Sequence, residues 1–166
     1  MTLKEFELEN HNLEGDELVR LFNLCFEYAD YFAVADNQTF FEKQKYIDFD
    51  FDLKDYHIMS YTTTNWFCYF NKEFFIDVYR ACEKSKEILL KYWSNLFVKD
   101  NIYDIPGFPE DICFFKGNNI FLGTLSHENM CSFFTADKEM EDKFKSICDW
   151  REYADFNYKD YPVLPI

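Results

Sequence analysis

The chain begins with two segments whose apolar residues repeat at different periods. Residues 3–10, LKEFELEN, alternate imperfectly between apolar and polar side chains, which is typical of a β-strand. In residues 15–28, GDELVRLFNLCFEY, apolar side chains recur every three or four positions, beginning with Leu18 and Leu21. Asp16 stands where a side chain can cap the start of a helix. The pattern therefore predicts a first strand and a first amphipathic helix.

Beyond Asp36 the periodicity is typical of strands. Strands are predicted over residues 46–53, 56–64, 65–70 and 74–81. Only a short link, Asn71-Lys72, separates the last two runs, and it is short enough for a hairpin. This part of the chain therefore predicts the larger share of a sheet.

The period changes again after residue 81. In residues 82–97 five large apolar side chains fall on one face of a helix: Ile88, Leu89, Tyr92, Trp93 and Leu96. Glu87 stands four residues before Lys91, a spacing that supports a helix. The sequence YDIPGFPED then ends the helical pattern.

The last third of the chain predicts a hairpin, a helix and an extended tail. Two apolar runs flank Lys116-Gly117-Asn118-Asn119, whose residue types suit a tight turn. A helix is expected from about Asp137, and residues 158–166, YKDYPVLPI, are expected to be extended. Taken together, the elements predict an α+β fold in which about three helices cover a mostly antiparallel sheet.

Length and composition refine this picture. The 166 residues suit a single domain spanning residues 1–166. Aromatic residues make up 22% of the chain, so we expect an aromatic-rich core with some rings at the surface. AT-rich codon usage would also raise the number of Phe and Tyr residues, so the excess is only partly a functional signal.

The chain is strongly acidic, with a formal net charge of −14. Residues 1–60 hold 5 Lys and Arg against 14 Asp and Glu. Such a field repels phosphate backbones and anionic lipid surfaces and speeds encounters with basic proteins. Direct nucleic-acid and membrane binding are therefore disfavoured.

Cysteine usage indicates a reducing compartment. None of the six cysteines forms C-x-x-C, and most lie in apolar runs. The first residues, MTLKEFELE, have neither the basic start nor the apolar core of a signal peptide. We expect buried free thiols and a cytoplasmic protein.

The alternating aspartates of KYIDFDFDLKDYH, residues 45–57, invite a metal-site interpretation. An EF-hand loop that starts at Asp48 would need Gly at its sixth position and Glu at its twelfth. This chain has Leu53 and Met59 there, so the match fails. As a strand, the segment would place its aspartates on one face and its apolar residues on the other. That acidic face is either a solvated surface or a docking surface for a basic partner. The residues predicted for docking are Asp48, Asp50, Asp52 and Asp55.

Catalytic and cofactor motifs are weak or missing. The D-x-D and D-x-K patterns resemble those of glycosyltransferases and nucleases, but a nucleotide-binding half and a basic groove are lacking. The histidines show no zinc-ligand spacing, and the four glycines form no phosphate-binding loop, so neither metal nor cofactor is expected. In SHENMC, the residues Ser126, His127, Glu128 and Cys131 lie close together, but neighbours in sequence seldom form a catalytic triad.

Residues 110–128, EDICFFKGNNIFLGTLSHE, resemble segments of small, stand-alone bacterial proteins. Some of these are regarded as immunity proteins of contact-dependent or polymorphic toxin systems. The shared features are an acidic pair before an apolar strand, a Gly/Asn turn, an aromatic-Leu-Gly strand and Ser-His-Glu at its end. The resemblance implies a non-enzymatic inhibitor and assigns no functional residue.

Three functions stay open at this point. The first is a cytoplasmic immunity or inhibitor protein that neutralises a basic protein partner, such as a toxin or nuclease. A related interpretation is DNA mimicry, because rows of carboxylates can stand in for phosphates. The second is a small hydrolase or transferase that uses His127 with Glu128 or Ser126. The third is a sensor that holds a ligand in an aromatic pocket.

Overall fold

The computed structural model describes residues 2–9, 11–36, 47–67, 69–97, 109–154, 157 and 161–166. Its elements are β1 (Lys4–Leu8), α1 (Gly15–Tyr28), β2 (Tyr31–Asp36), α2 (Ile47–Leu53), β3 (His57–Trp66), β4 (Tyr69–Arg80), α3 (Glu83–Tyr92), β5 (Glu110–Lys116), β6 (Asn119–Leu125), β7 (Met130–Thr135), α4 (Lys138–Lys145) and β8 (Trp150–Tyr153). Two single 3-10 turns are also present, η1 (Lys54–Tyr56) and η3 (Ser126–Glu128).

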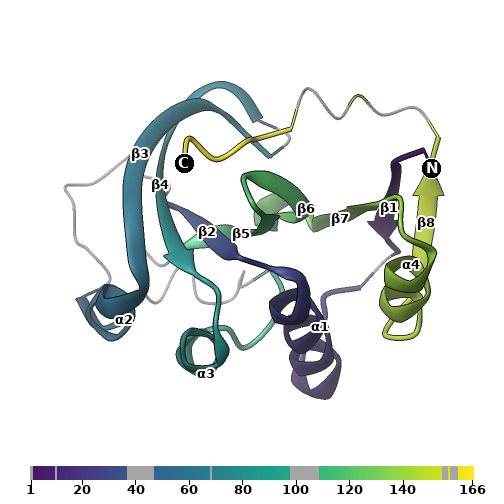
Figure 1. Cartoon of the computed structure of the whole chain (residues 1–166), viewed down its shortest axis with the longest axis horizontal. Helices are drawn as coiled ribbons and strands as arrows, with labels where there is room; N and C mark the ends of the chain where they lie inside the picture. Colours follow the sequence, from purple (N-terminus) through teal and green to yellow (C-terminus); the bar gives the residue numbers. More distant parts are fainter. Residues whose placement is uncertain are drawn as a thin grey trace.

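The eight strands form one sheet in the order β3-β4-β2-β5-β6-β7-β1-β8, with every neighbouring pair antiparallel. The four helices α1 to α4 lie beside one another on one face of this sheet, as Figure 1 shows. The predicted α+β fold with a mostly antiparallel sheet is therefore confirmed. The described residues contain four helices rather than about three.

Aromatic rings fill the layer between the helices and the sheet. Phe133 on β7 stacks on Phe6 of β1 and on Phe144 of α4, with ring centroids 4.8 and 4.5 Å apart. Phe114 on β5 meets the edge of Phe22 on α1 at 5.6 Å. All five rings are fully buried. The high aromatic content thus supplies this core, because each ring removes a large apolar area from water.

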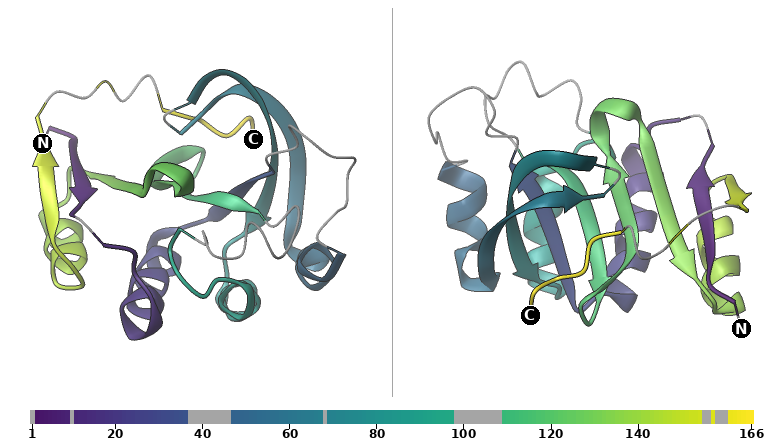
Figure 2. Two further views of the ribbon diagram at one scale, coloured as in Figure 1. Left: turned by 180° about the vertical axis from the view of Figure 1, so that it is seen from behind. Right: turned by 90° about the horizontal axis from the view of Figure 1, so that it is seen from above.

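The opposite face of the sheet is covered by a bent hairpin and the C-terminal residues. The long strands β3 and β4 arch over this face, and the chain end runs beneath the arch (Figures 1 and 2). At the end of the arch, Phe67 packs 5.6 Å from the ring of Tyr161. A Cβ atom at Gly123 would lie 2.7 Å from the Phe67 ring, so this close approach depends on glycine.

The turn between β5 and β6 confirms the predicted hairpin. Gly117 adopts a φ of +56°, a conformation that glycine reaches without strain. The Asp30 carboxylate accepts hydrogen bonds from the Gly117 N–H at 2.7 Å and from Lys116 Nζ at 3.0 Å. The Gly117 hydrogen bond is the main cause that lowers the pKa of Asp30, although burial opposes it.

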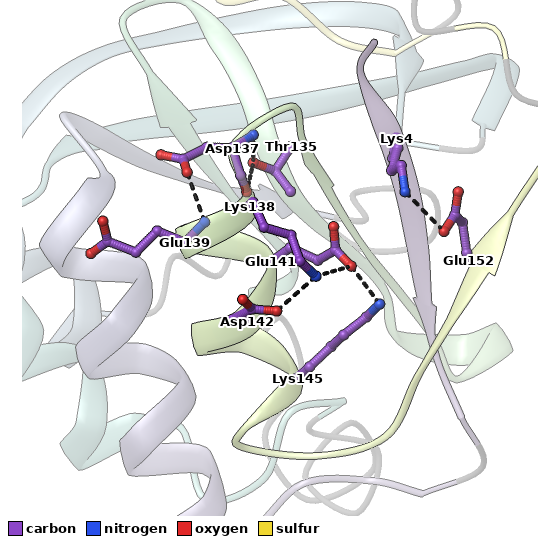
Figure 3. Close-up of polar contacts among 9 residues, drawn as sticks. All are labelled: Lys4, Thr135, Asp137, Lys138, Glu139, Glu141, Asp142, Lys145 and Glu152. Carbon is purple, nitrogen blue, oxygen red and sulfur yellow. Dashed lines mark hydrogen bonds and ion pairs between the residues drawn. The ribbon is translucent and has the colours of Figure 1, made fainter. Parts of the chain in front are cut away.

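The predicted last helix begins where expected and carries a balanced set of charges. Asp137 caps α4, because its Oδ1 accepts the Glu139 N–H at 2.8 Å. Glu141 accepts from Lys145 at 2.7 Å and from Lys138 at 3.1 Å (Figure 3). The Glu141 carboxylate is thus neutralised by two lysines of its own helix.

Several sequence-based expectations were wrong. Residues 47–53 form a helix and not a strand, and Asn71 and Lys72 lie inside β4 instead of in a turn. The predicted helix over residues 82–97 ends at Tyr92. The N-cap of α1 is Glu14, without a side-chain cap, and not Asp16. The strands β2, β7 and β8 were not predicted.

The five cysteines in the described ranges are free thiols. Cys25, Cys113 and Cys131 are buried, and Cys82 and Cys148 are partly buried. Burial is the main cause that raises the pKa of the Cys25 and Cys131 thiols. Cys68 lies outside the described residues. The buried thiols of Cys25, Cys113 and Cys131 therefore behave as small apolar groups of the core, whereas Cys82 is the N-cap of α3.

Candidate binding surface

The helix α2 is fixed to the fold through two apolar side chains one turn apart. Phe49 and Leu53 are 1% and 0% exposed. The Phe49 ring lies edge-on to Tyr92 of α3 at 5.4 Å and to Tyr79 of β4 at 5.9 Å. A four-residue spacing puts both anchors on one helix face, so this segment buries its apolar residues better as a helix than as a strand.

Two of the four aspartates predicted for docking also hold α2 in place. The Tyr79 hydroxyl donates to Asp50 at 3.2 Å, and the Tyr92 hydroxyl donates to Asp52 at 2.8 Å. Desolvation, followed by the hydrogen bond to Asp52, raises the pKa of Tyr92 to about 12. Asp50 is partly buried, whereas Asp52 stays exposed.

The exposed side of α2 combines carboxylates with an aromatic ring. Phe51, which the strand interpretation placed on the same face as Phe49, is 62% exposed, and Lys54 Nζ lies 3.8 Å from its ring centroid. Asp48 and Asp55 are also exposed. Helical spacing places Asp48 one turn from both Phe51 (i, i+3) and Asp52 (i, i+4). We call Asp48, Phe51, Asp52 and Asp55 the α2 surface.

The carboxylates of the α2 surface lack a cationic partner. Within the described ranges, no Lys, Arg or His forms an ion pair with Asp48, Asp52 or Asp55. The strand arrangement predicted for these acids was wrong, because Asp50 points to the core side and Phe51 to solvent. The structure nevertheless brings Asp48, Asp52 and Asp55 to one exposed region. Their role in binding stays a prediction.

A second polar cluster on β3 and β4 was not foreseen. His57 Nε2 lies 2.9 Å from Ser60 Oγ and 3.2 Å from Asp77 Oδ1, and the Ser60 hydroxyl donates to Asp77. A Ser-His-Asp triad needs the carboxylate at one ring nitrogen and the serine at the other. Here both contact the same nitrogen, and the serine proton is directed to the carboxylate. The arrangement therefore does not prepare Ser60 for nucleophilic attack.

The SHENMC segment separates its buried candidate groups, Ser126 and Cys131, from the exposed pair His127 and Glu128. Ser126 is fully buried, its Oγ accepts the Asp111 N–H at 3.3 Å, and its own N–H donates to Asp111 Oδ1 at 2.6 Å. His127 and Glu128 are exposed and lie 3.6 Å apart. Cys131 is buried. Ser126 thus serves the backbone at the start of β5, out of reach of a substrate.

The described residues contain neither a metal-binding cluster nor a membrane-spanning helix. No group of three or more His, Cys, Asp or Glu side chains in these ranges could hold a metal ion. Among the same residues, no helix has the length and apolar character required to cross a membrane. Comparisons of the chain with protein-family models, curated proteins and solved structures found no match.

Proposed function

We propose that this chain is a non-enzymatic, acidic binding protein whose α2 surface docks on a basic protein partner. The observation that carries this proposal is the exposed ring of Phe51 beside carboxylates that have no cationic partner among the described residues. A cytoplasmic immunity or inhibitor protein that neutralises a toxin is the specific role that we propose.

The charge of the chain supports encounter with such a partner. The formal net charge is −14, so the molecule attracts a basic protein over several ångströms of water and salt. Electrostatic steering of this kind raises the association rate more than it lowers the dissociation rate. The α2 surface would add directed attraction where its charges are not already neutralised.

The exposed aromatic ring supports a lasting contact. Interface hot spots are rich in large rings that fill a pocket of the partner while a polar rim excludes water. Phe51 has this character, because its ring is 62% exposed, with Asp48 one helical turn away and Lys54 Nζ 3.8 Å from its centroid. Removing it should increase the dissociation rate more than it slows association.

The anchoring of α2 supports a rigid docking element. Its inner face is buried, and two tyrosine hydroxyls bind its carboxylates. A surface that is ordered before binding loses less conformational entropy in the complex. The same feature distinguishes α2 from an acidic segment that is merely solvated.

The test removes the charges and keeps the shape. A quadruple variant, Asp48→Asn, Asp50→Asn, Asp52→Asn and Asp55→Asn, retains an oxygen acceptor for each tyrosine hydroxyl. A matched control removes four exposed acids elsewhere: Glu9→Gln, Glu14→Gln, Asp16→Asn and Asp149→Asn. The first partner to examine is the product of a neighbouring gene that encodes a basic domain.

Association rates with this partner decide the outcome. At low salt, the quadruple variant should associate about tenfold more slowly, and the control should change the rate less. The difference should shrink in high salt as screening removes the steering. Equal rates for the quadruple variant and the wild type at low salt would remove the α2 surface from the proposal. If the partner is toxic, protection of cells should follow the same order.

A further inference from the structure

The strand β3 forms one edge of the sheet, and no other strand of the described residues pairs with its outer side. It has ten residues, and β4 is its only neighbour in the sheet of the described residues. Every second residue of an edge strand directs its N–H and C=O away from the sheet. In Figure 1, β3 is the outermost strand and begins at α2.

The usual protections of an exposed edge are sparse on β3. Residues 58–64, IMSYTTT, contain no charged side chain and no proline. Their pairing with β4 is regular from Met59 to Thr63, and register shifts occur only at the two ends. Near the bend, Thr63 Oγ1 accepts the Asn65 N–H at 3.1 Å, so this donor already has a partner. We call residues 58–64 the β3 edge.

The other edge of the sheet is protected in the expected way. The strand β8 has four residues, and two of them are charged. Glu152 pairs with Lys4 at 3.2 Å, and Arg151 pairs with Glu7 at 3.1 Å. A short, charged edge resists pairing with another strand. The contrast between the edges singles out β3.

We propose that the β3 edge accepts an extended segment of the basic partner as an added antiparallel strand, with basic residues of that segment at its C-terminal end. This inference rests on the proposed function, because it names the part of the partner that docks beside the α2 surface. Main-chain hydrogen bonds to the β3 edge would provide affinity, as in other cases of strand addition.

Charge fixes the kind of occupant, and the antiparallel pairing of every neighbouring strand in this sheet gives its direction. Asp55 lies two residues before β3, so the acidic α2 surface stands at the N-terminal end of this strand. In antiparallel pairing, the C-terminal end of the added strand reaches that position. Basic side chains there would meet Asp48, Asp52 and Asp55. A second copy of the chain, with a net charge of −14, would be repelled.

The side chains of β3 specify which residues the added strand should carry. Met59 and Tyr61 are partly buried against the core beneath the arch, whereas Ser60, Thr62 and Thr64 are exposed. Neighbouring strands match side chains on each face. A segment that alternates apolar and β-branched polar residues therefore fits best.

The probe is a synthetic peptide of seven alternating valine and threonine residues followed by three lysines. Its control has the same sequence with every amide of the seven-residue part N-methylated, which keeps the charge and removes the hydrogen-bond donors. The affinity of the wild-type protein for each peptide is measured, together with amide hydrogen exchange over residues 58–64 with and without peptide.

We expect the N-methylated peptide to bind at least about tenfold more weakly, because several main-chain hydrogen bonds are lost. Exchange should slow at alternate residues of the β3 edge when the unmethylated peptide binds. The quadruple variant Asp48→Asn, Asp50→Asn, Asp52→Asn and Asp55→Asn should weaken the binding of both peptides by a similar factor, since both carry the same charge.

Three results would overturn the inference. If both peptides bind the wild type with equal affinity and neither binds the quadruple Asp→Asn variant, strand addition is excluded. Charge-based docking at the α2 surface would then still stand. No binding of either peptide, while the basic partner still binds, would also exclude it. Protection of the β3 edge that depends on protein concentration without peptide would assign the edge to a second copy of the chain.

Discussion

At the β8 end of the sheet, carboxylates and cations neutralise one another, whereas at the β3 end Asp48, Asp52 and Asp55 form no ion pair with a described Lys, Arg or His. Glu141 and Glu152 contact lysines within 3.2 Å, but Asp48 and Asp55 form no such pair in these ranges. The same difference separates the two edge strands, since β8 is short and charged, whereas β3 is long and its residues 58–64 contain no charged side chain. The β8 end therefore resists pairing with another strand, whereas the β3 end carries the acidic surface and the edge strand on which the proposed docking depends.

The largest effect should come from the anchor of the α2 end. Phe49→Ala removes a ring that is 1% exposed, so the free energy of unfolding should fall by about 3–5 kcal/mol. Phe51→Ala is the matched control, and it should change the same quantity by less than about 0.5 kcal/mol. Denaturant titration measures both. Equal losses would mean that the two rings share a buried face, as the strand interpretation required.

A smaller effect should follow from loss of the Tyr92 hydroxyl. Tyr92→Phe removes the hydrogen bond to Asp52 and should lower the free energy of unfolding by about 1 kcal/mol at pH 7. The folded state raises the pKa of Tyr92 to about 12, above its value of about 10 in the unfolded chain. The contribution should therefore be complete below about pH 10 and disappear as the pH rises toward about 12.

The control for this change lies at the opposite end of the sheet. Tyr153 on β8 is 47% exposed, and Tyr153→Phe should change the free energy of unfolding at pH 7 by less than about 0.5 kcal/mol. Denaturation curves of the three proteins at matched pH values give the comparison. A wild-type advantage over Tyr92→Phe that grows with pH would contradict the assigned hydrogen bond.

At the β8 end of the sheet, loss of one α4 carboxylate should lower the free energy of unfolding only slightly, and this loss should disappear at acid pH. Glu141→Gln replaces a carboxylate that accepts from Lys145 and Lys138, and it should cost about 0.5 kcal/mol, less in high salt. These lysines, Lys145 first, lower the pKa of Glu141 below its usual value of 4.5. The contribution should be present above about pH 4.5 and be lost as the pH falls. Urea titrations at pH 7 and pH 3 test this, and an equal difference at both would refute it.

The smallest change in the free energy of unfolding should come from removing the four aspartate charges at the β3 end of the sheet. The quadruple Asp→Asn variant of α2 should be as stable as wild type, or more stable by up to about 0.5 kcal/mol at low salt, because like-charge repulsion is relieved. Thermal or urea unfolding at two salt concentrations measures it. A loss of more than about 1 kcal/mol would show that these carboxylates stabilise the fold instead of being available to a partner.

Prediction from the spacing of apolar residues succeeded where only one of the helix and strand periods fits. It failed where both periods fit the same residues. Gly117 and Asp137 mark a turn and a helix start by local chemistry, and both were found. In residues 47–53 the spacing of Phe49 and Leu53 fits a helix as well as the alternation fits a strand, and contacts with α3 and β4 decide. The strand β7 was missed because nearly all its residues are buried on both faces, which erases alternation.

The candidate site could be predicted only in part for the same reason. The aspartates were visible as charge, but Phe51 was assigned to the core because alternation placed it with Phe49. The cluster of His57, Ser60 and Asp77 depends on the pairing of Ser60 with Asp77 across two strands, a register that no local pattern states.

The position of β1 has a consequence for how the chain folds during synthesis. This first strand lies between β7 and β8, with Glu5 opposite both Phe134 and Tyr153. Its partners leave the ribosome more than a hundred residues later, so β1 must wait unpaired while the middle of the chain is made. Sheet closure at that end joins residues far apart in sequence, which predicts slow folding for a protein of this size. The ribosome-bound chain would therefore present both unpaired edges of β1 until β7, and after it β8, have been made.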